Sequence, residues 1–585
     1  MPDGPLIIQS DHTLLLEVDH AGYADARNDL LGFAELVKSP EHVHTYRITP
    51  LSVWNARAAG HSADDMVTAL EWHARFPPPG NVIRELREQA QRYGRLRLFK
   101  QVFADREAGV AEDLRLKVDT QELADQLAST KGLADHLNLR DDTDPTVFVL
   151  DPAGRGVVKQ ALIKAGYPAE DYAGYTGGAA LDLKLRDTTK QRPDQPFALR
   201  PYQQDAVDAF AGAGGDEGMG GSGVIVLPCG AGKTVIGIAA MAAAGTATLI
   251  LAPSTTAVRQ WIAELLDKTT LEAHQVAEYS GSTKDIAPVT VATYQVLTSR
   301  KNKDAPLEHL ALFDREDWGL IVYDEVHLLP APVFAATATI QSRRRLGLTA
   351  TLVREDGREE DVFALIGPKK ADVPWKTLEG QGWIAKARCV EVRVEMPDDR
   401  MREYHAADRR SMFRIASENP AKAAQVKRIL SLHPGEPALV IGMYVEQLKA
   451  LAAQLDAPLI VGSTGQKKRD QLFESFRQGE IPVLVVSKVA NFAVDLPDAS
   501  LAVQVSGTFG SRQEEAQRLG RLLRPKAPKD DAGHDPEANQ AHFYSLVSRD
   551  TNEQEFALNR QLFLCEQGYQ YRLVDAEQDD AVLRA

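Results

Sequence analysis

The chain lacks the features that mark secreted, metal-thiolate and membrane-spanning proteins. Only three of its 585 residues are cysteines, and no C-x-x-C pair is present, which argues against a disulfide framework, a zinc–thiolate site or an iron–sulfur cluster. The N-terminus carries Asp3, Asp11 and Glu17 and has no basic segment followed by an apolar one, so no secretory signal is expected. The longest apolar region, 224–253, is interrupted by Lys233 and several glycines, so we expect no membrane span and a cytoplasmic location.

An excess of positive charge is also missing. The 67 Lys and Arg residues are outnumbered by 82 Asp and Glu residues, giving a formal net charge of −15. Bulk electrostatics therefore do not favour nucleic-acid binding, which would need a local basic surface. The hydrophobic fraction of 44% is typical of a globular protein, and the length suggests three or four domains.

What the chain does contain is a phosphate-binding loop, residues 227–234 (LPCGAGKT). The apolar run before it predicts a buried strand, and the residues after it predict a helix whose N-terminus favours an anion. Lys233 would reach the β- and γ-phosphates of a nucleotide, and the hydroxyl of Thr234 would ligate Mg²⁺. Leu227 stands where the strict pattern has glycine, so the loop alone leaves open an ordinary glycine-rich turn. The predicted nucleotide-binding residues here are Pro228, Cys229, Gly230, Ala231, Gly232, Lys233 and Thr234.

A second motif places two carboxylates after an apolar run. Residues 318–323 predict a buried strand that ends in Asp324 and Glu325, with His327 close behind. Ligands of α/β sheets bind beyond the carboxyl ends of the strands. Asp324 is placed to hold Mg²⁺, Glu325 to orient and deprotonate the attacking water, and His327 to hydrogen-bond to the next strand.

Three further groups of polar residues fit the same chemistry. Thr349 and Thr351 end the next predicted strand, where their hydroxyls would couple the phosphate state to the neighbouring loop. Gln203, just after Arg200, has an amide that could select adenine. If residues 517–524 are helical, three arginines lie on one face of that helix. A γ-phosphate between them would offset the repulsion of their positive charges, and two of the arginines would then act as arginine fingers. The residues concerned in that segment are Gln517, Arg518, Arg521 and Arg524, of which Arg521 and Arg524 are the predicted fingers.

The order of apolar runs and helical stretches predicts two α/β lobes in tandem, each with a doubly wound parallel sheet, after smaller α/β domains. The strands expected in the first lobe are Val224–Leu227, Thr248–Ala252, Val289–Ala292, Leu320–Tyr323 and Arg345–Leu348, and those in the second are Ala438–Ile441, Pro458–Val461, Val483–Val486 and Leu501–Val505. In the smaller domains we expect a strand at Thr13–Val18 and helices at Asp25–Val37, Asn81–Tyr93 and Gly154–Ala165, the last with Lys159 and Lys164 facing solvent.

Taken together, these motifs resemble superfamily 2 nucleic-acid motors, and most closely the bacterial and archaeal members of the XPB helicase family. The stretches that carry the resemblance are LRPYQ at 199–203, the phosphate loop, DEVH at 324–327, GLTATLVREDGR at 347–358, VVSKVANFAVDLP at 485–497, GSRQEEAQRLGRLLR at 510–524 and the segment 543–569. The resemblance is strong over 197–575 and weaker before it.

The resemblance implies two RecA-like lobes and an organisation into four parts. These are an N-terminal XPB-type domain (1–95), a small domain similar in place to a damage-recognition domain with a linker (96–190), helicase lobe 1 (191–370), and helicase lobe 2 (371–585) with a short thumb-like insertion near 396–418. In the insertion, basic residues interleave with Tyr404 and Phe413, a composition that suits gripping a strand.

The resemblance also implies ATP- and Mg²⁺-dependent movement on DNA in the 3′ to 5′ direction, in nucleotide-excision repair, with a separate nuclease as a possible partner. Arg354, Glu355 and Asp356 match a family motif implicated in strand separation, and Arg200 and Asp495 fall in motifs of the ATP site. Contacts with DNA phosphates are expected from Ser254, Thr255, Thr256, Thr293, Tyr294, Ser463 and Thr464. Such contacts carry little sequence information, so binding should be salt-sensitive and nonspecific.

Three alternatives remain open from the sequence. The nearest is a double-stranded DNA translocase that remodels DNA with a nuclease or transcription partner and does not unwind it. A catalytically idle scaffold for repair proteins is the second, although the intact set of ATP-site residues argues against it. A small-molecule kinase is the third, but it would not need a second lobe with inward-facing arginines.

Overall fold

The computed structural model divides into two compact units, and each is described by itself. The first comprises residues 1–35, 46–227 and 232–372, and the second comprises 36–45, 228–231 and 373–585. The structure describes residues 4–584 except 40–41, 104–110, 213–219, 229, 301–306, 342, 351–358, 374–377, 379–385, 488–498, 508–539, 567–568 and 570. Within these residues no helix has the length and apolar character needed to cross a bilayer.

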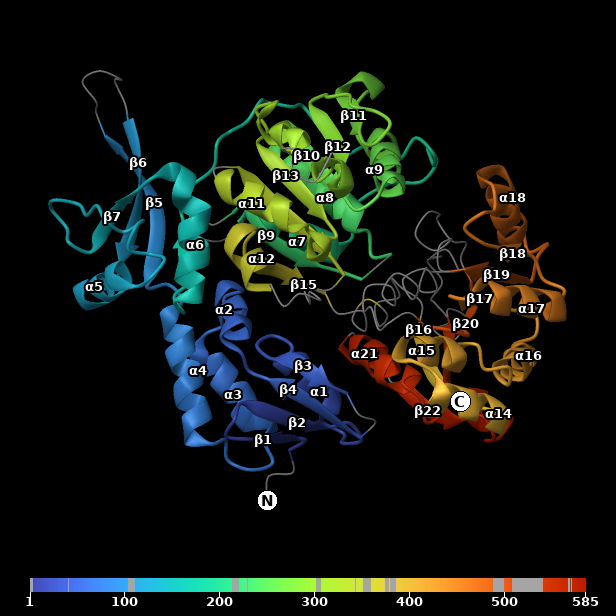
Figure 1. Ribbon diagram of the computed structural model, residues 1–585. Coiled ribbons are helices and arrows are strands. Elements are labelled where there is room, and N and C mark those ends of the chain that lie inside the picture. The colour runs from blue at the N-terminus through green and yellow to red at the C-terminus, as the bar shows by residue number, and fades with distance from the viewer. Residues whose placement is uncertain are drawn as a thin grey trace. The chain divides into compact units, whose positions relative to one another are not determined.

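The centre of the first unit is a seven-stranded parallel sheet in the order β11-β12-β10-β13-β14-β9-β15 (Figure 1). Its strands are β9 (Ser222–Val226), β10 (Thr248–Ala252), β11 (Val276–Tyr279), β12 (Val289–Thr293), β13 (Leu320–Asp324), β14 (Arg344–Thr349) and β15 (Lys369–Asp372). Its helices are α7 (Pro201–Ala211), α8 (Lys233–Ala244), α9 (Thr255–Lys268), α10 (Tyr294–Leu297), α11 (Ala331–Thr339) and α12 (Glu359–Leu365). Strands β9, β10 and β12 are buried throughout, as expected for a sheet covered on both faces, and the predicted α/β class is confirmed.

The N-terminal region forms a four-stranded sheet in the order β1-β2-β4-β3 with helices beside it. Its elements are β1 (Leu6–Ile8), β2 (Thr13–Glu17), α1 (Tyr23–Leu30), β3 (Glu35–Lys38), β4 (Val43–Arg47), α2 (Pro50–Ala58), α3 (Ala63–His73) and α4 (Gly80–Arg92). The predicted helix Asp25–Val37 is wrong in its second half, because α1 ends at Leu30 and the chain turns through Gly32 into β3. The pairing of β3 with β4 outweighs the helical pattern there.

A second four-stranded sheet, β7-β6-β5-β8, follows in the chain. Its elements are β5 (Leu96–Phe103), β6 (Ala111–Val118), α5 (Gln121–Ser129), β7 (Val147–Leu150), α6 (Arg155–Lys164) and β8 (Ala169–Asp171). In Figure 1, α6 lies beside α11 and α12 of the parallel-sheet lobe, where Gly156 packs directly against the backbone of Ala338.

The expectation that Lys159 faces solvent is wrong. Its ammonium is buried, 3.1 Å from Asp171 Oδ2, and donates to Gln341 Oε1 of the lobe at 3.0 Å. Burial lowers the pKa of Lys159 to about 8 even though Asp171 favours its charged form. Burial would raise the pKa of Asp171, but Lys159 and Arg155 outweigh it and hold that pKa below its usual value. The prediction of a solvated helix face failed because the chain brings Gln341, 182 residues away, against the Lys159 ammonium.

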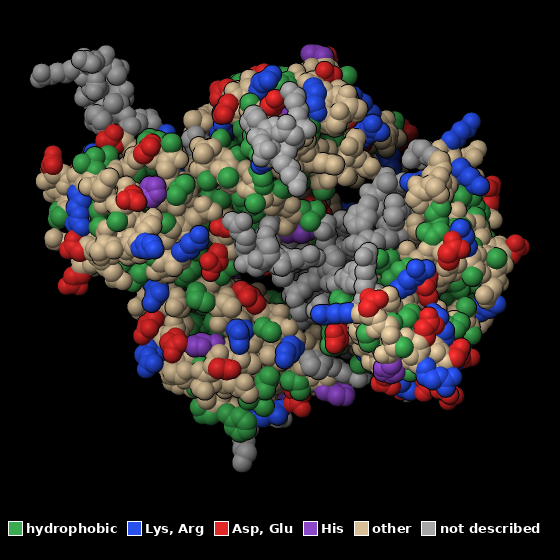
Figure 2. Space-filling view, viewed as in Figure 1, with side chains coloured by type: hydrophobic (Ala, Val, Ile, Leu, Met, Phe, Trp, Pro, Cys, Tyr) green, Lys and Arg blue, Asp and Glu red, His purple; other side chains and the backbone are tan. Residues whose placement is uncertain are grey.

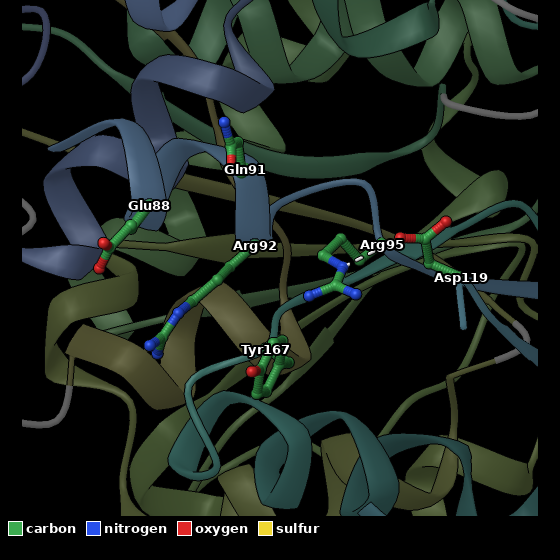
Figure 3. Close-up of a pocket in the computed structure, with 6 residues that line it drawn as sticks. All are labelled: Glu88, Gln91, Arg92, Arg95, Asp119 and Tyr167. Atoms are coloured by element: carbon green, nitrogen blue, oxygen red, sulfur yellow. Dashed lines mark hydrogen bonds and ion pairs between the residues drawn. The ribbon is translucent and has the colours of Figure 1, made fainter. Parts of the chain in front are cut away.

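An open polar pocket of about 540 Å³ lies in the first unit, against the C-terminal end of α4. Figure 3 shows the guanidinium of Arg95 directed at Asp119, at 3.1 Å, with Arg92 and Tyr167 beside them. Two arginines and two carboxylates line this pocket, so their formal charges balance. On the face that Figure 2 shows, acidic and basic side chains are likewise mixed, in keeping with a chain that has no overall positive charge.

The second unit contains another seven-stranded parallel sheet, in the order β18-β19-β17-β20-β21-β16-β22. Its strands are β16 (Lys386–Val394), β17 (Ala438–Gly442), β18 (Leu459–Ile460), β19 (Val483–Ser487), β20 (Leu501–Gln504), β21 (Gln540–Ser548) and β22 (Tyr571–Asp575). Its helices are α14 (Asp398–Ala406), α15 (Arg409–Ser417), α16 (Lys422–Leu432), α17 (Val445–Leu455), α18 (Gln466–Arg477), α21 (Glu553–Glu566) and α22 (Asp580–Arg584). All nine strands predicted for the two lobes are present, which confirms the tandem arrangement.

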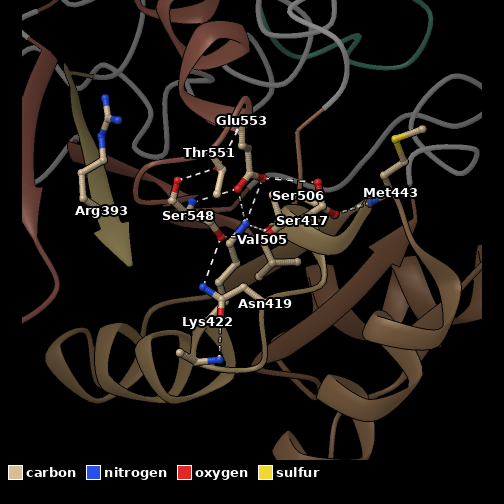
Figure 4. Close-up of polar contacts among 12 residues, drawn as sticks. Arg393, Ser417, Asn419, Lys422, Met443, Val505, Ser506, Ser548, Thr551 and Glu553 are labelled. Carbon is tan, nitrogen blue, oxygen red and sulfur yellow. Dashed lines mark hydrogen bonds and ion pairs between the residues drawn. The ribbon is translucent and has the colours of Figure 1, made fainter. Parts of the chain in front are cut away.

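A buried ion pair ties the helices of this lobe to its sheet. Lys422, at the start of α16, contacts both carboxylate oxygens of Glu553, at 2.7 and 2.9 Å, and donates to the carbonyl of Val505 (Figure 4). The side chains of Lys422 and Glu553 are 1% and 0% exposed. Glu553 also accepts from the backbone N–H of Ser548 at 2.8 Å, so the pair is embedded in a hydrogen-bonded network.

The segment predicted as a strand-gripping insertion is the helix pair α14 and α15. Its aromatic residues face the lobe's own interior: Tyr404 is 4% exposed, and Phe413 packs edge-on against Phe556 with ring centroids 5.0 Å apart. The hydroxyl of Tyr404 accepts from the backbone N–H of Asn552. Stacking of these two rings on nucleic-acid bases is therefore not available in this arrangement.

Candidate nucleotide site

The sheet of the first unit brings the predicted catalytic residues to one edge. Strand β9 precedes the phosphate loop, β14 lies next to β9, and β13 lies next to β14. Because all three strands are parallel, their carboxyl ends meet at the same edge. The backbone N–H of Leu227 donates to the carbonyl of Thr349 at 2.9 Å, so the first residue after β9 is tied to the end of β14. Segments separated by about a hundred residues thus form one candidate site.

Two glycines shape the phosphate loop. Gly230 and Gly232 have φ values of 85° and 83°, in the left-handed region that residues with a Cβ rarely adopt. A Cβ on Gly232 would also lie 2.5 Å from Nε2 of Gln203. Helix α8 begins directly after this glycine, so Lys233 and Thr234 occupy its first turn, and the N-terminus of a helix favours an anion.

The start of α7 holds Gln203 against this loop. Its side chain is buried, and Oε1 accepts from the backbone N–H of Arg200 at 2.9 Å in a reciprocal cap. The Arg200 guanidinium donates to the hydroxyl of Tyr202 at 3.1 Å. The amide oxygen of Gln203 is therefore engaged at the helix start while its nitrogen faces Gly232, and its selection of adenine stays a prediction.

Lys233 and Glu325 form an ion pair across the site. Nζ of Lys233 lies 2.8 Å from Oε1 of Glu325, and the two side chains are 11% and 12% exposed. Glu325 itself is left-handed, with a φ of 49°, a conformation that costs a residue with a side chain about 1–3 kcal/mol and is concentrated at functional sites. Burial would raise the pKa of Glu325, but the charge of Lys233 outweighs it and holds the pKa below its ordinary value. Glu325 is therefore ionised at neutral pH.

Asp324 is held by two aromatic residues. Nε1 of Trp261, on α9, donates to Oδ2 of Asp324 at 3.0 Å, and the Tyr294 hydroxyl donates to its backbone carbonyl at 2.8 Å. Burial, with a further contribution from the charge of Glu325, raises the pKa of Asp324 to about 6. Sequence reasoning missed Trp261, although its spacing from Val258 and Leu265 marks the buried face of α9.

His327 links two of the strand ends. Its Nδ1 lies 2.8 Å from Oγ1 of Thr349 and 3.5 Å from Oε2 of Glu325. His327, Thr349 and Glu325 are all buried or nearly so. A displacement of the Glu325 carboxylate would therefore move the imidazole of His327 and, through it, the end of β14. The coupling role predicted for His327 and Thr349 stays a prediction, now with a defined contact.

The residues predicted to grip DNA differ in how exposed they are. Thr293 and Tyr294 are buried, and the Thr293 hydroxyl accepts from the backbone N–H of Val296. Ser254 caps α9 by accepting from Ala257, and the Thr464 hydroxyl accepts from Val461. Ser463 is exposed, and Thr255 and Thr256, in the first turn of α9, are at least partly exposed. The remaining predicted site residues lie outside the described part of the chain: Cys229, Thr351, Arg354, Glu355, Asp356, Asp495, Gln517, Arg518, Arg521 and Arg524.

Three sequence families match separate parts of the chain. The C-terminal helicase family of ERCC3/RAD25/XPB matches residues 378–582, and the type III restriction enzyme res-subunit family matches 196–354. A helicase conserved C-terminal domain family matches 6–141. Two of these matches fall on the parallel-sheet lobes, in agreement with the RecA-like fold, and the third falls on the two smaller sheets that precede them.

Full-length relatives are similar over almost the whole chain. A protein of Kineococcus radiotolerans named DNA 3'-5' helicase XPB is 53% identical over 99% of this chain and 98% of its own length. A protein of the same name from Mycobacterium tuberculosis is 52% identical over 99% of both chains. Among solved structures, the Hef helicase domain of Pyrococcus furiosus matches 62% of this chain and 98% of its own, with 16% identity and a TM-score of 0.41.

Proposed function

Because the chain belongs to the XPB family of DNA 3′–5′ helicases, we propose that it is an ATP-dependent helicase that moves 3′ to 5′ on DNA. The observation that supports this most directly is the contact between Lys233 and Glu325 at the shared edge of three parallel strands. A phosphate-binding lysine and a water-activating carboxylate must meet at one γ-phosphate, and here they lie within 2.8 Å of each other.

In the proposed mechanism, the triphosphate binds the loop 228–234 and takes the place of Glu325 as the partner of Lys233. The released Glu325 carboxylate, still ionised, then accepts a proton from the attacking water. Thr234 and Asp324 have the oxygen donors that suit Mg²⁺, which would neutralise charge on the phosphates. Trp261 fixes the orientation of the Asp324 carboxylate, and His327 would pass the displacement of Glu325 to Thr349.

The second lobe would supply the remaining groups. Arg521 and Arg524 would act on the γ-phosphate, with Gln517 and Arg518 coupling hydrolysis to movement and Asp495 contacting the nucleotide. In the first lobe, Arg354, Glu355 and Asp356 would take part in strand separation. The partner would be DNA in single-stranded, forked or damaged form. The protein would act in nucleotide-excision repair and would be located in the cytoplasm. The chain has no recognisable nuclease motif, so any DNA cutting would come from a separate protein.

The test is ATP hydrolysis and unwinding by the purified chain on single-stranded, duplex, bubble and forked DNA. We expect ATPase activity that rises on adding DNA, and unwinding of a fork with a 3′ tail but not of one with only a 5′ tail. Displacement of a triplex-forming strand without fork unwinding would favour the translocase alternative. Phosphate release that is unchanged by DNA would remove the motor function altogether.

The raised pKa of Asp324 predicts a pH dependence of Mg²⁺ use. The carboxylate must be ionised to attract Mg²⁺, so it loses that ability as the pH falls through about 6. Below its pKa, each further pH unit lowers the ionised fraction of the group about tenfold. We therefore expect the Mg²⁺ concentration for half-maximal ATPase activity to rise several-fold between pH 7.5 and pH 5.5.

A Trp261→Phe variant provides the matched comparison for this pH series. The indole N–H stabilises the ionised form of Asp324, so its loss should move the midpoint to a higher pH. A Mg²⁺ requirement that is the same across the pH range in both proteins would contradict the assignment of Asp324.

A further inference from the structure

Three potential metal ligands gather at the amino-terminal edge of the second lobe's sheet. His433 follows the end of α16, Glu436 lies just before β17 at Ala438, and His542 lies near the start of β21. One ligand atom from each of the three lies within 4.8 Å of the others. The ATP-site residues predicted for this lobe follow the carboxyl ends of β19 and β20, so this cluster belongs to the opposite edge.

The hydrogen bonds of Tyr544 determine which nitrogen of His433 carries a proton. The Tyr544 hydroxyl lies 3.0 Å from the carbonyl of Leu583, which can only accept, so the hydroxyl donates there. Its oxygen then accepts from Nε2–H of His433, 2.9 Å away. In the neutral ring this leaves the lone pair on Nδ1.

The lone pair on Nδ1 faces a carboxylate oxygen. Oε1 of Glu436 lies 3.2 Å from Nδ1 of His433, and two acceptors at that distance need a proton or a cation between them. The His433 side chain is 1% exposed, so solvent does not separate the two atoms. The arrangement therefore requires either a proton or a bound metal ion between the two atoms.

A third donor favours the metal ion. The imidazole of His542 lies with its centroid 4.3 Å from that of His433, and it adds a second nitrogen to the donor set. Two imidazoles and one carboxylate suit Zn²⁺ and similar ions, whereas Mg²⁺ prefers oxygen alone. Ligand bonds of about 2.0–2.1 Å at tetrahedral angles place neighbouring ligand atoms about 3.3 Å apart, close to the 3.2 Å between His433 and Glu436.

We propose that His433, Glu436 and His542 bind one transition-metal ion of the Zn²⁺ type. Tyr544 is a positioning residue, because its hydrogen bond to Nε2 presents Nδ1 to the metal, as is usual for histidine ligands. The ion would join the end of α16, the entry to β17 and the start of β21. Its role is structural: it holds the amino-terminal edge of the second lobe together, and it is separate from the Mg²⁺ that accompanies ATP.

The test uses the full-length chain, stripped of metal with a chelator and titrated with Zn²⁺ by calorimetry in a buffer that contains Mg²⁺. We expect one Zn²⁺ per chain, and a rise in the melting temperature of the wild type when Zn²⁺ is added. Glu436→Gln and His542→Gln should each weaken binding at least tenfold and abolish that rise, and Tyr544→Phe should weaken binding about 10- to 100-fold. Glu436 is only partly buried, so its variant keeps the test informative if a histidine variant fails to fold.

His274→Gln is the matched control, because His274 is an exposed histidine with a carboxylate, Glu272, at 3.4 Å. It should bind Zn²⁺ as the wild type does. Co²⁺ provides a second readout, because a ligand-field absorption band seen in the wild type should be lost in His542→Gln. Equal Zn²⁺ affinity in all variants, or no stoichiometric binding by the folded wild type, would overturn the proposal and leave a proton between His433 and Glu436.

Discussion

Replacing Lys233 with alanine should lower DNA-stimulated ATP hydrolysis by about 10²–10³-fold while DNA binding stays close to that of the wild type. The ammonium lies 2.8 Å from Oε1 of Glu325, and it is placed to stabilise charge on the transferred phosphoryl group. Steady-state phosphate release and DNA binding by fluorescence anisotropy, both at one salt concentration, measure the two effects. Lys184→Ala is the control, because that lysine is 74% exposed and should leave both values unchanged.

Loss of folding must be separated from loss of catalysis in this variant. Removing Lys233 leaves the Glu325 carboxylate buried without its cation, which destabilises a protein by about 3–5 kcal/mol in comparable cases. The double variant Lys233→Ala with Glu325→Gln removes that unpaired charge, so it should regain stability without regaining turnover. Hydrolysis at the wild-type rate in folded Lys233→Ala would contradict the assignment of the phosphate loop.

Breaking the ion pair inside the second lobe should strongly destabilise that lobe. Lys422→Met leaves Glu553 charged at 0% exposure, so we expect a loss of about 3–5 kcal/mol in the free energy of unfolding of this lobe. Thermal and urea unfolding of the full chain, followed by calorimetry and circular dichroism, should show an earlier transition. Lys449→Met tests the contrast, because its pair with Glu446 is exposed and should contribute no more than about 1 kcal/mol.

A second substitution distinguishes the charge from the packing at this position. Lys422→Met with Glu553→Gln removes both charges and keeps a side chain able to accept from Ser548. It should recover part of the stability that Lys422→Met loses, because no uncompensated charge is then buried. A double variant that is destabilised by the sum of the two single effects would show that the pair is not coupled.

Local pattern was enough to locate the nine strands that carry the two motor lobes, because continuous apolar runs between helices are the signature of strands buried on both faces. Strands β11, β15, β16, β21 and β22 were not predicted. Of these, β11, β15 and β22 are edge strands, and β16 and β21 lie next to one another inside the second sheet. The helix expected at Asp25–Val37 was overestimated because the pairing of β3 with β4 depends on residues outside that window.

By itself, the sequence determined the chemistry available to this protein: a glycine loop with Lys233 and Thr234, and a strand ending in Asp324 and Glu325. Residue type and spacing are sufficient to predict this chemistry, because they set the local backbone conformation and the reactive groups that it carries. Only the tertiary structure decided that Lys233 contacts Glu325, that Trp261 orients Asp324 and that Lys159 is buried. Each of these depends on which distant strands and helices become neighbours, and that is set by packing of the whole sheet, which no local pattern encodes.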